Sequence, residues 1–381
     1  MTGVLGRDHP GSGRPVRVAV DATPLLGHRT GIGHSTAALL EELADRLDVT
    51  LRAYAVTWSG RRNLATLVPH GVTPCARRVP ARAARWLWRR ADHPRIERWT
   101  GPVDVVHGTN FVAPPSRAPA IVTVHDLTCV RFPELCTSDT LEYPRLLRRA
   151  LDRGAVVHVV SDTVADEVRD TFSLAADRVV RIYPGVMSVT GGDPASGRAL
   201  SGRDRYVLAL GTIEPRKNLE ALVRAFDAVA ADDDTLGLVL AGPDGLGASR
   251  VHDAIAGARS AARITTLGYV DDPTRADLLA GSTAFAYPSL YEGFGHPPLE
   301  AMSVGIPVVA TRAGALGEVL GDAALLVDPS DDDALASGLA RVVTESALRD
   351  ELVERGRTRT QRYSWTASAD EMAALYRRVE R

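Results

Sequence analysis

Short runs of β-branched and small apolar residues alternate with helix-like stretches along almost the whole chain, and this alternation constrains the fold more than any other feature. Strands that are buried on both faces and separated by helices are typical of parallel sheets with helices on both sides. The sequence therefore predicts an α/β fold of doubly wound, Rossmann-like type. The predicted strands are Val16–Asp21, Val103–His107, Ile121–His125, Ala155–Val160, Tyr206–Gly211, Leu236–Gly242, Ala284–Pro288 and Pro307–Thr311.

The length of the chain indicates two such domains. A chain of 381 residues with 45% hydrophobic residues is too long for one core. We expect an N-terminal domain over 1–190, a linker rich in Gly, Ser and charge over 191–205, and a C-terminal domain over 206–363, with a cleft between the domains. The segment 364–381 is expected to form an amphipathic helix that packs back towards the N-terminal domain. Its apolar positions at helical spacing are Trp365, Ala369, Met372, Tyr376 and Val379.

The composition argues against several classes of protein. The formal net charge is −2 and the pI is about 6.6, which does not favour nucleic acid as a partner. Residues 1–15 contain no apolar stretch of signal-peptide length, and no later run reaches the ~18 residues of a membrane span, so we expect a cytoplasmic protein. The cysteines, Cys75, Cys129 and Cys136, form no C-x-x-C pair, and neither a disulfide framework nor a zinc site is expected.

The segment Ala284–Gly305 carries the most chemistry. It runs from a predicted strand through the loop 293–296 into a helix that two consecutive prolines start. Free backbone amides at a helix N-terminus bind anions. Glu292 lies on the loop and Glu300 lies in the first helical turn, so both carboxylates can face one ligand from different sides.

Other polar residues follow predicted strands, where doubly wound folds bind ligands. Arg216 and Lys217 follow a strand of the C-terminal half and would meet the same ligand as the two carboxylates. In the N-terminal half, His125 and His107 each end a strand, and the residues alone leave both open between a site role and a structural role. The acidic run at 232–234 lies between predicted elements, and we interpret it as a solvated turn and not as a metal site.

Together these motifs resemble glycosyltransferase family 4, whose members have the GT-B fold of two Rossmann-like domains facing a cleft. The signature is Glu292-x7-Glu300 within YEGFGHPPLEAMSVGIPVVAT, and the resemblance covers nearly the whole chain. It is nearest to a branch of mannosyltransferases that build bacterial surface glycans. Further matching motifs, in the family's order, are Gly31-Ile-Gly33, Val124-His-Asp126, Pro184-Gly-Val186, Gly211–Asn218, Leu240-Ala-Gly242, Gly268-Tyr-Val270 and Asp322–Pro329.

The resemblance implies how a nucleotide-diphosphate sugar is bound. It assigns Glu300 to the ribose hydroxyls of the donor and Glu292 to hydroxyls of the transferred sugar. It assigns Arg216 and Lys217 to the diphosphate, where they stabilise the departing nucleotide and remove the need for a metal or another cofactor. His125 is implied to lie beside the reacting sugar. The other implied donor-binding residues are Gly31, Gly33, Tyr269, Val270, Gly293, Phe294, Gly295, His296 and Leu299.

Two residues depart from the family pattern. Thr212 stands where other branches have an Arg directly after the glycine that matches Gly211, which leaves open which cation makes the more direct phosphate contact. His296 stands where an aliphatic residue is common, so the sugar pocket is expected to differ slightly.

The function implied by the resemblance is that of a retaining glycosyltransferase. Its donor would be GDP- or UDP-linked, with mannose from GDP-mannose as our choice, and its acceptor a glycan or a lipid-linked molecule. The alternatives are a nucleotide-sugar epimerase of the same fold and a noncatalytic nucleotide-sugar-binding protein. A glycosidase is disfavoured, because Glu292 and Glu300 lie at an anion-binding helix start beside two cations.

The segment 75–101 carries eight Arg against Asp92 and Glu97. Such a surface can contact the anionic inner face of a cell membrane or an anionic lipid-linked acceptor. The alternative is a solvated basic helix whose tryptophans pack inward. The interleaved tryptophans are Trp86, Trp88 and Trp99.

Overall fold

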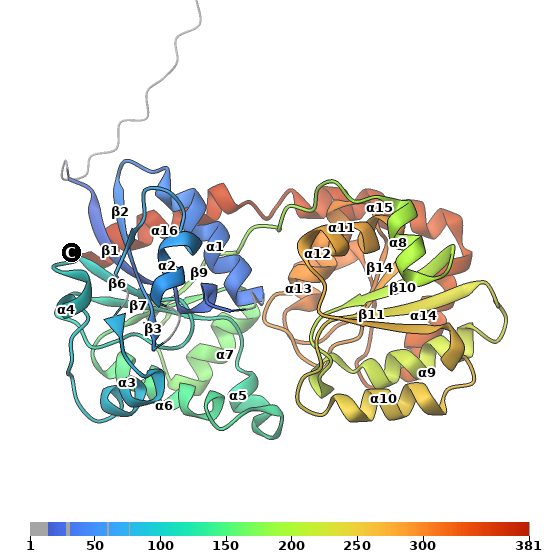
Figure 1. The fold of residues 1–381 in the computed structure, drawn as a ribbon, viewed down its shortest axis with the longest axis horizontal. Coiled ribbons are helices and arrows are strands. Elements are labelled where there is room, and N and C mark those ends of the chain that lie inside the picture. Colours follow the sequence, from blue (N-terminus) through green and yellow to red (C-terminus); the bar gives the residue numbers. More distant parts are fainter. Residues whose placement is uncertain (1–13, 28–30, 59–60, 76, 381) are drawn as a thin grey trace, which may run out of the picture.

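The computed structural model describes residues 14–27, 31–58, 61–75 and 77–380. It has two α/β domains that lie side by side along the long axis of the molecule, as Figure 1 shows. Each domain is built on one parallel sheet with helices packed on both faces, so the predicted doubly wound architecture is confirmed. Most of the predicted leading segment 1–15, residue 76 of the basic segment and the last residue of the predicted C-terminal helix lie outside the described residues.

The N-terminal sheet has seven parallel strands, and its order reverses between β1 and β6. In spatial order the strands are β4 (Thr73–Pro74), β2 (Val49–Tyr54), β1 (Val16–Asp21), β6 (Val105–Gly108), β7 (Ala120–Val124), β8 (Val156–Val159) and β9 (Val179–Arg181). A small separate pair is formed by β3 (Val56–Thr57) and β5 (Arg77–Arg78).

The C-terminal sheet has six parallel strands, and its order reverses between β10 and β13. In spatial order the strands are β12 (Ile264–Gly268), β11 (Leu236–Ala241), β10 (Arg205–Leu210), β13 (Ala284–Tyr287), β14 (Val308–Thr311) and β15 (Leu325–Val327). Each strand is followed by a loop at its carboxyl end, and ligands of open parallel sheets bind at this edge, at the point of reversal.

Helices cover both faces of each sheet. Those of the N-terminal domain are α1 (Gly31–Ala44), α2 (Arg61–Leu67), α3 (Ala81–Trp88), α4 (Glu97–Thr100), α5 (Thr128–Arg131), α6 (Tyr143–Asp152) and α7 (Asp162–Phe172). The rest are α8 (Pro194–Ser201), α9 (Leu219–Val229), α10 (Ala248–Gly257), α11 (Asp272–Gly281), α12 (His296–Ser303), α13 (Leu316–Leu320), α14 (Asp332–Thr344), α15 (Ser346–Thr360) and α16 (Trp365–Glu380). Short turns of 3-10 helix connect several of them.

The period-2 alternation of the strands sends apolar side chains to both faces of the sheets. In β1, Val18 and Val20 pack in the core cluster under α1 and α16, whereas Ala19 packs on the other face with Tyr54 and Trp88. Strand β11 is buried along its whole length, as a central parallel strand must be.

The segment 191–205, predicted as a linker, contains helix α8 instead. Asp193 caps the helix by accepting hydrogen bonds from the backbone amides of Ala195 and Ser196 at 3.1 and 3.0 Å. Two of the glycines that suggested flexibility, Gly192 and Gly197, allow close packing on α11, since a Cβ added at Gly197 would lie 2.1 Å from the carbonyl oxygen of Asp277. The stretch is therefore part of the C-terminal domain, and the chain crosses between the domains over residues 182–193.

The chain crosses back between α15 and α16, beside the first crossing (Figure 1). The two crossing segments are joined by a backbone hydrogen bond from Val186 to Tyr363 of 3.1 Å. Helix α16 then packs against α1, β1 and β6 of the N-terminal domain. Its Tyr376 is fully buried there, with its hydroxyl 2.8 Å from Nδ1 of His107.

We predict that Tyr376→Phe destabilises the N-terminal domain by about 1–3 kcal/mol, because it leaves a buried ring nitrogen of His107 without its partner. The urea midpoint of unfolding measures the effect. Glu371→Gln, on the exposed side of the same helix, is the matched control and should leave the midpoint unchanged. Equal midpoints for Tyr376→Phe and the wild type would contradict the role of this bond.

Candidate functional site

The floor of the site in the C-terminal domain is formed by the carboxyl ends of β10 and β13, where the sheet order reverses. A small pocket opens there, lined by Lys217 from the turn η5 (Pro215–Lys217) and by Ser289 from the loop after β13. Gly211 follows β10 with a φ of 137°, which lets the chain turn sharply towards η5. The reversal point thus brings the loop after β10 next to the loop after β13.

A buried ion cluster joins these two loops. Glu292 binds Lys217 Nζ through Oε1 at 2.6 Å and Arg216 through Oε2 at 2.9 Å. Lys217 also donates to the hydroxyl of Tyr287 at 2.7 Å. Arg216 also pairs with Glu214 at 2.8 Å and donates to the carbonyl oxygen of the residue before Glu292 at 2.9 Å. Three of the residues predicted from sequence therefore form one constellation.

Burial and the two cations act on Glu292 in opposite directions. Burial would raise the pKa of its carboxylate, but the charges of Lys217 and Arg216 outweigh burial and lower the pKa to about 2. Burial lowers the pKa of Lys217, and the charge of Glu292 opposes that shift. Because the folded-state pKa of Glu292 is depressed from 4.5, the cluster stabilises the fold above that pH and loses its contribution as the pH falls towards 2.

Glu300, the second predicted carboxylate, lies on α12 and is paired separately. Its side chain is buried, and Oε2 accepts a hydrogen bond from Arg275 of α11 at 2.7 Å. Arg275 also pairs with Asp272 at 3.3 Å. The two predicted carboxylates thus have different cationic partners on different elements.

The loop between the carboxylates reaches α12 through Gly295, whose φ of 104° is available to glycine at little cost. Phe294 is buried against the rings of Tyr183 and Tyr363, and Leu299 is fully buried in the domain core. The side chains of Phe294 and Leu299 therefore support the loop and α12 from the domain core, and the predicted contacts of these two residues with the donor stay predictions.

Tyr269 and Val270 follow β12, at the same edge of the sheet as the ion cluster. The side chain of Tyr269 is half exposed, whereas Val270 packs partly against the domain core. Within the 232–234 run, Asp233 pairs with Arg205 at 2.8 Å and accepts hydrogen bonds from Thr235, as expected of a turn. Among the described residues no cluster of His, Cys, Asp and Glu is arranged to hold a metal ion.

In the N-terminal domain, His125 follows β7 directly. Its Nε2 donates to the carbonyl oxygen of Thr109 at 2.8 Å, so Nδ1 carries the lone pair of the neutral ring. Burial lowers the pKa of His125, although the bond to Thr109 and the charge of Asp126 oppose that shift. The imidazole is therefore neutral at pH 7 and can accept a proton or a hydrogen bond through Nδ1.

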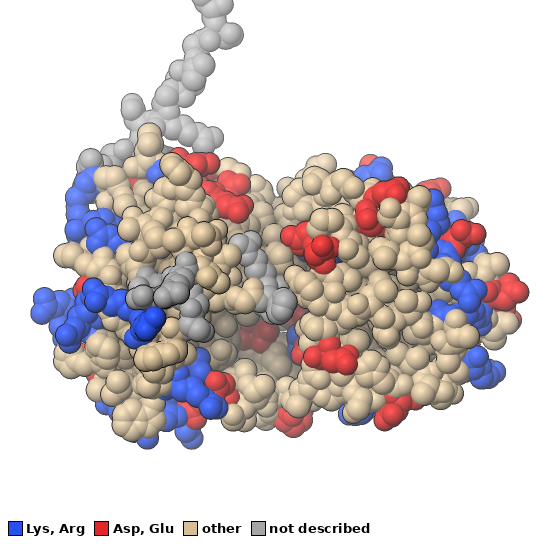
Figure 2. Space-filling model, in the orientation of Figure 1, with Lys and Arg blue, Asp and Glu red and all other residues tan. Residues whose placement is uncertain are grey.

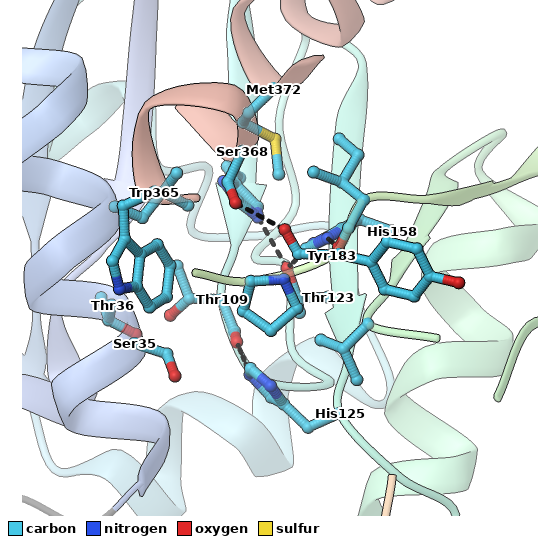
Figure 3. A pocket seen from close by; sticks show the side chains of 15 residues that line it. Ser35, Thr36, Thr109, Thr123, His125, His158, Tyr183, Trp365, Ser368 and Met372 are labelled. Carbon is cyan, nitrogen blue, oxygen red and sulfur yellow. Dashed lines mark hydrogen bonds between the residues drawn. The ribbon is translucent and has the colours of Figure 1, made fainter. Parts of the chain in front are cut away.

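His125 lies at the edge of a small pocket, shown in Figure 3. The pocket lies between α1, the ends of the N-terminal strands, the first crossing segment and the start of α16. His107 and His158 line its back and share Thr123 Oγ1 as a partner at 2.8 Å each. Burial lowers the pKa of His107 to about 3, and the residue is structural because both its ring nitrogens are bonded.

The loop of the ion cluster touches the N-terminal domain at two residues, Tyr291 and Gly293. The hydroxyl of Tyr291 accepts from the amide of Leu127 at 3.0 Å and donates to Glu167. The carbonyl oxygen of Gly293 accepts from Ser161 Oγ at 2.8 Å. Gly293 also lies against the backbone of His125, and an added Cβ would come within 1.8 Å of the His125 carbonyl oxygen. Glu292 lies between these two contact residues.

A second contact between the domains involves a helix N-terminus. Glu318 of α13 accepts hydrogen bonds from the backbone amides of Asp162 and Thr163 at the start of α7, at 2.7 and 2.8 Å. A carboxylate at this position also interacts favourably with the helix dipole. Tyr183 of the crossing segment donates to the same carboxylate at 2.9 Å.

The first turn of α1 closes the site from the N-terminal side. The predicted Gly31 and Gly33 lie in this turn, and Ser35 Oγ accepts from Nε2 of His296 at 2.9 Å while donating to the carbonyl oxygen of Gly31. The ring of Trp365 stacks on that of His296 with an interplanar angle of 14°. His296, the departure noted in the sequence, is therefore a contact between the two domains and α16.

Sequence reasoning missed several residues of this arrangement, among them Arg275, Tyr287 and Glu318. Each of them acts through a partner that is distant in the chain, on another strand or helix. Tyr291 was also missed, although its place directly before Glu292 in the sequence could have suggested it. The others could be found only once the elements were placed in space.

Two family models match the chain, one in each domain. The model described as Glycosyltransferase Family 4 matches residues 29–187, and the model described as Glycosyl transferases group 1 matches residues 197–359. O-antigen chain mannosyltransferase B of Escherichia coli is 32% identical over 284 residues, which are 72% of this chain and 74% of that protein. The chain belongs to glycosyltransferase family 4.

Other relatives of this family 4 glycosyltransferase include further mannosyltransferases. MMP alpha-(1->4)-mannosyltransferase of Mycolicibacterium hassiacum is 29% identical over 322 residues, which are 83% of this chain and 65% of that protein. Serotype-specific mannosyltransferase WbdA of Escherichia coli is 30% identical over 232 residues, which are 57% of this chain and 28% of that protein. The relatives support transferase activity.

Solved structures of low identity share the fold of this family 4 glycosyltransferase. Sucrose-phosphate synthase of Thermosynechococcus elongatus has a TM-score of 0.74 at 21% identity, and the match covers 95% of this chain and 98% of that one. WaaG, a glycosyltransferase involved in lipopolysaccharide biosynthesis, has a TM-score of 0.73 at 16% identity, with 94% and 99% covered. The predicted GT-B fold is confirmed.

Proposed function

We propose that the protein transfers mannose from GDP-mannose to a glycan or a lipid-linked acceptor, with retention of anomeric configuration and without a metal or other cofactor. The observation that carries the proposal is the ion cluster of Arg216, Lys217 and Glu292 at the reversal point of the C-terminal sheet, on the loop that touches His125. A mannosyl donor is favoured because two of the relatives are mannosyltransferases. A UDP-linked donor is the competing choice, because the related Anabaena HepE structure contains UDP and glucose at 16% identity and a TM-score of 0.71.

The two cations suit a leaving diphosphate. Negative charge grows on the β-phosphate oxygens as the bond between the sugar and the phosphate breaks, and fixed cations stabilise this charge without reorganisation. Glu292 already holds Arg216 and Lys217 in place from opposite oxygens. In the proposal the diphosphate becomes a further acceptor for the same two cations, and they take the part that a divalent ion plays elsewhere.

Retention needs no carboxylate nucleophile in this site. The acceptor hydroxyl approaches from the side on which the nucleotide leaves, and a β-phosphate oxygen takes its proton. Neutral His125 lies at the junction of the two domains, where its Nδ1 can hold a hydroxyl of the sugar or of the acceptor. The adjoining pocket between α1, the first crossing segment and α16 is proposed to mark the side from which the acceptor approaches.

We further propose that the protein works in the cytoplasm, at the inner face of the cell membrane, through the surface around α3. Figure 2 shows Lys and Arg side chains along the outer side of the N-terminal domain. Trp88 packs inward, but Trp86 is 50% exposed with Arg90 over its ring at 4.3 Å, and Leu87 beside it is 39% exposed. Arg85 pairs with Asp139 at 2.8 Å, and the more exposed Arg82 pairs with the same carboxylate at 3.3 Å.

No helix among the described residues has the length and apolar character that crossing a bilayer requires. An exposed Trp with flanking Arg is suited to the interface of an anionic bilayer instead.

We predict that GDP-mannose is the preferred donor. We also predict that transfer persists in EDTA, because Arg216 and Lys217 neutralise the diphosphate. The measurement is release of nucleotide from GDP-mannose, UDP-glucose and ADP-glucose, with and without a glycan or lipid extract as acceptor. Conversion of a donor without any acceptor would indicate an epimerase. Loss of activity in EDTA with recovery in Mg²⁺ or Mn²⁺ would contradict the metal-independent mechanism.

We predict that Lys217→Ala lowers kcat by about 10²–10³-fold, the usual effect of removing one preorganised stabiliser of developing negative charge. Arg216→Ala should act similarly, and the double variant should fall short of additivity because both cations share Glu292. Steady-state kinetics with a fixed acceptor measure the effect. A change confined to KM would place these residues in substrate binding alone.

His125→Ala is the matched control for Lys217→Ala. It should lower turnover while it leaves the affinity for GDP unchanged, because His125 lies on the N-terminal side of the cleft. Calorimetry with GDP separates the two variants. Wild-type turnover in His125→Ala would return this residue to a structural role.

We predict that reversal of Arg82 and Arg90 to Glu, combined with Trp86→Ser, lowers binding to anionic vesicles by about tenfold or more. Vesicles of phosphatidylglycerol and phosphatidylcholine in a flotation assay at low salt provide the measurement. Leu47→Ser, which changes a side chain that is 95% exposed elsewhere, is the control. A wild-type protein that does not float with the vesicles would end the membrane proposal.

A further inference from the structure

The pair formed by Arg275 and Glu300 links two helices at the edge of the donor site. Arg275 lies in the first turn of α11, directly after the loop of Tyr269 and Val270. Its guanidinium donates to Oε2 of Glu300 at 2.7 Å, and a second nitrogen lies 3.3 Å from Asp272. The loop after β12 is thereby connected to the carboxylate on α12.

The ion pair of Arg275 and Glu300 is not expected to contribute much to the stability of the fold. The Glu300 side chain is 5% exposed and the Arg275 side chain is 18% exposed, so both charges lose most of their hydration. Taking two charges out of water costs about as much as their attraction returns. Nε of Arg275 is also buried and has no hydrogen-bond partner among the described residues, which adds a further cost. A pair with these properties is suited to holding a charged group for a ligand.

We propose that Arg275 is a positioning residue that keeps Glu300 ionised and fixes the direction of its carboxylate towards the ribose of the donor. The proposal rests on the proposed function, in which Glu300 accepts hydrogen bonds from the ribose hydroxyls. A carboxylate has about four acceptor positions, so the bond of Oε2 to Arg275 leaves capacity for a vicinal diol. Arg275 therefore acts through Glu300.

The charges around Glu300 support this role. Burial raises the pKa of Glu300, the charge of Arg275 opposes that rise, and the charge of Asp272 from the same helix adds to it. Without Arg275 the pKa rises further, and the carboxyl takes up a proton as the pH falls through the new value. A protonated carboxyl donates one hydrogen bond of its own and suits a diol less well.

The test compares Arg275→Met with the wild type by calorimetry against GDP and against 2′-deoxy-GDP, from pH 6 to pH 9. We expect Arg275→Met to bind GDP about 10- to 100-fold more weakly at pH 7, the range of a lost charge-assisted contact. The ratio of wild-type to variant affinity should grow as the pH falls; this ratio is the readout, because titration of the terminal phosphate of GDP at about pH 6 affects both proteins alike. With 2′-deoxy-GDP, which lacks one ribose hydroxyl, the variant should lose several-fold less than it loses with GDP.

Two further variants separate positioning from folding. Arg275→Lys keeps the positive charge, so it should recover much of the affinity and the pH dependence of the wild type. Arg224→Met removes an ion pair with Asp332 of 2.7 Å on the surface of the same domain, and it should leave GDP affinity unchanged. Thermal melting of each variant without ligand verifies that it is folded.

Equal losses for GDP and 2′-deoxy-GDP in Arg275→Met would overturn the proposal, and so would unchanged affinity for both. These outcomes leave the proposed function standing, because the wild type still binds nucleotide. If the wild type binds neither GDP nor UDP, the proposed function fails and the role of Arg275 fails with it.

Discussion

The ion cluster of Glu292, Arg216 and Lys217 is the interaction on which the arrangement of the site depends. The two cations follow β10 and the carboxylate follows β13, so the cluster spans the point where the order of the C-terminal sheet reverses. A buried carboxylate without partners would take up a proton, and two unpartnered buried cations would repel one another. Together the three charges form a site that keeps both cations in position before a ligand arrives. The cations in turn keep Glu292 ionised, since its pKa is lowered to about 2.

The same loop joins the two domains, so binding and domain contact share one structural element. Tyr291 and Gly293, on either side of Glu292, contact α7 and the strand ends of the N-terminal domain. The loop of the ion cluster is in direct backbone contact with His125, whose carbonyl oxygen lies against Gly293. Glu318 of α13 adds a second contact between the domains, through the backbone amides at the start of α7.

The sequence predicted those features that depend on local pattern. Periodicity located eight of the thirteen strands in the two main sheets, and β1 has the same bounds, Val16–Asp21, in the structure. It missed β2, β4, β9, β12 and β15. The residue types after strands located Arg216, Lys217 and Glu292, because parallel strands bring their carboxyl ends to one edge. Glycine composition misled at 191–205, since Gly192 and Gly197 serve close packing on α11 and not flexibility. Leu299 and Arg275 could not be placed, because which side of a helix faces the core or a carboxylate depends on the position of its neighbours.

The central claim is that two protein cations, without a metal, bind the β-phosphate of the donor. Calorimetry with GDP and GMP in the presence of EDTA tests it most directly, because the two ligands differ only in that phosphate. The account predicts that GDP binds at least about tenfold more tightly than GMP, as a charge-assisted contact of roughly 1.4 kcal/mol or more requires, and that the difference shrinks as salt is added. Equal affinities for GDP and GMP, or binding of GDP only when Mg²⁺ is restored, would contradict it.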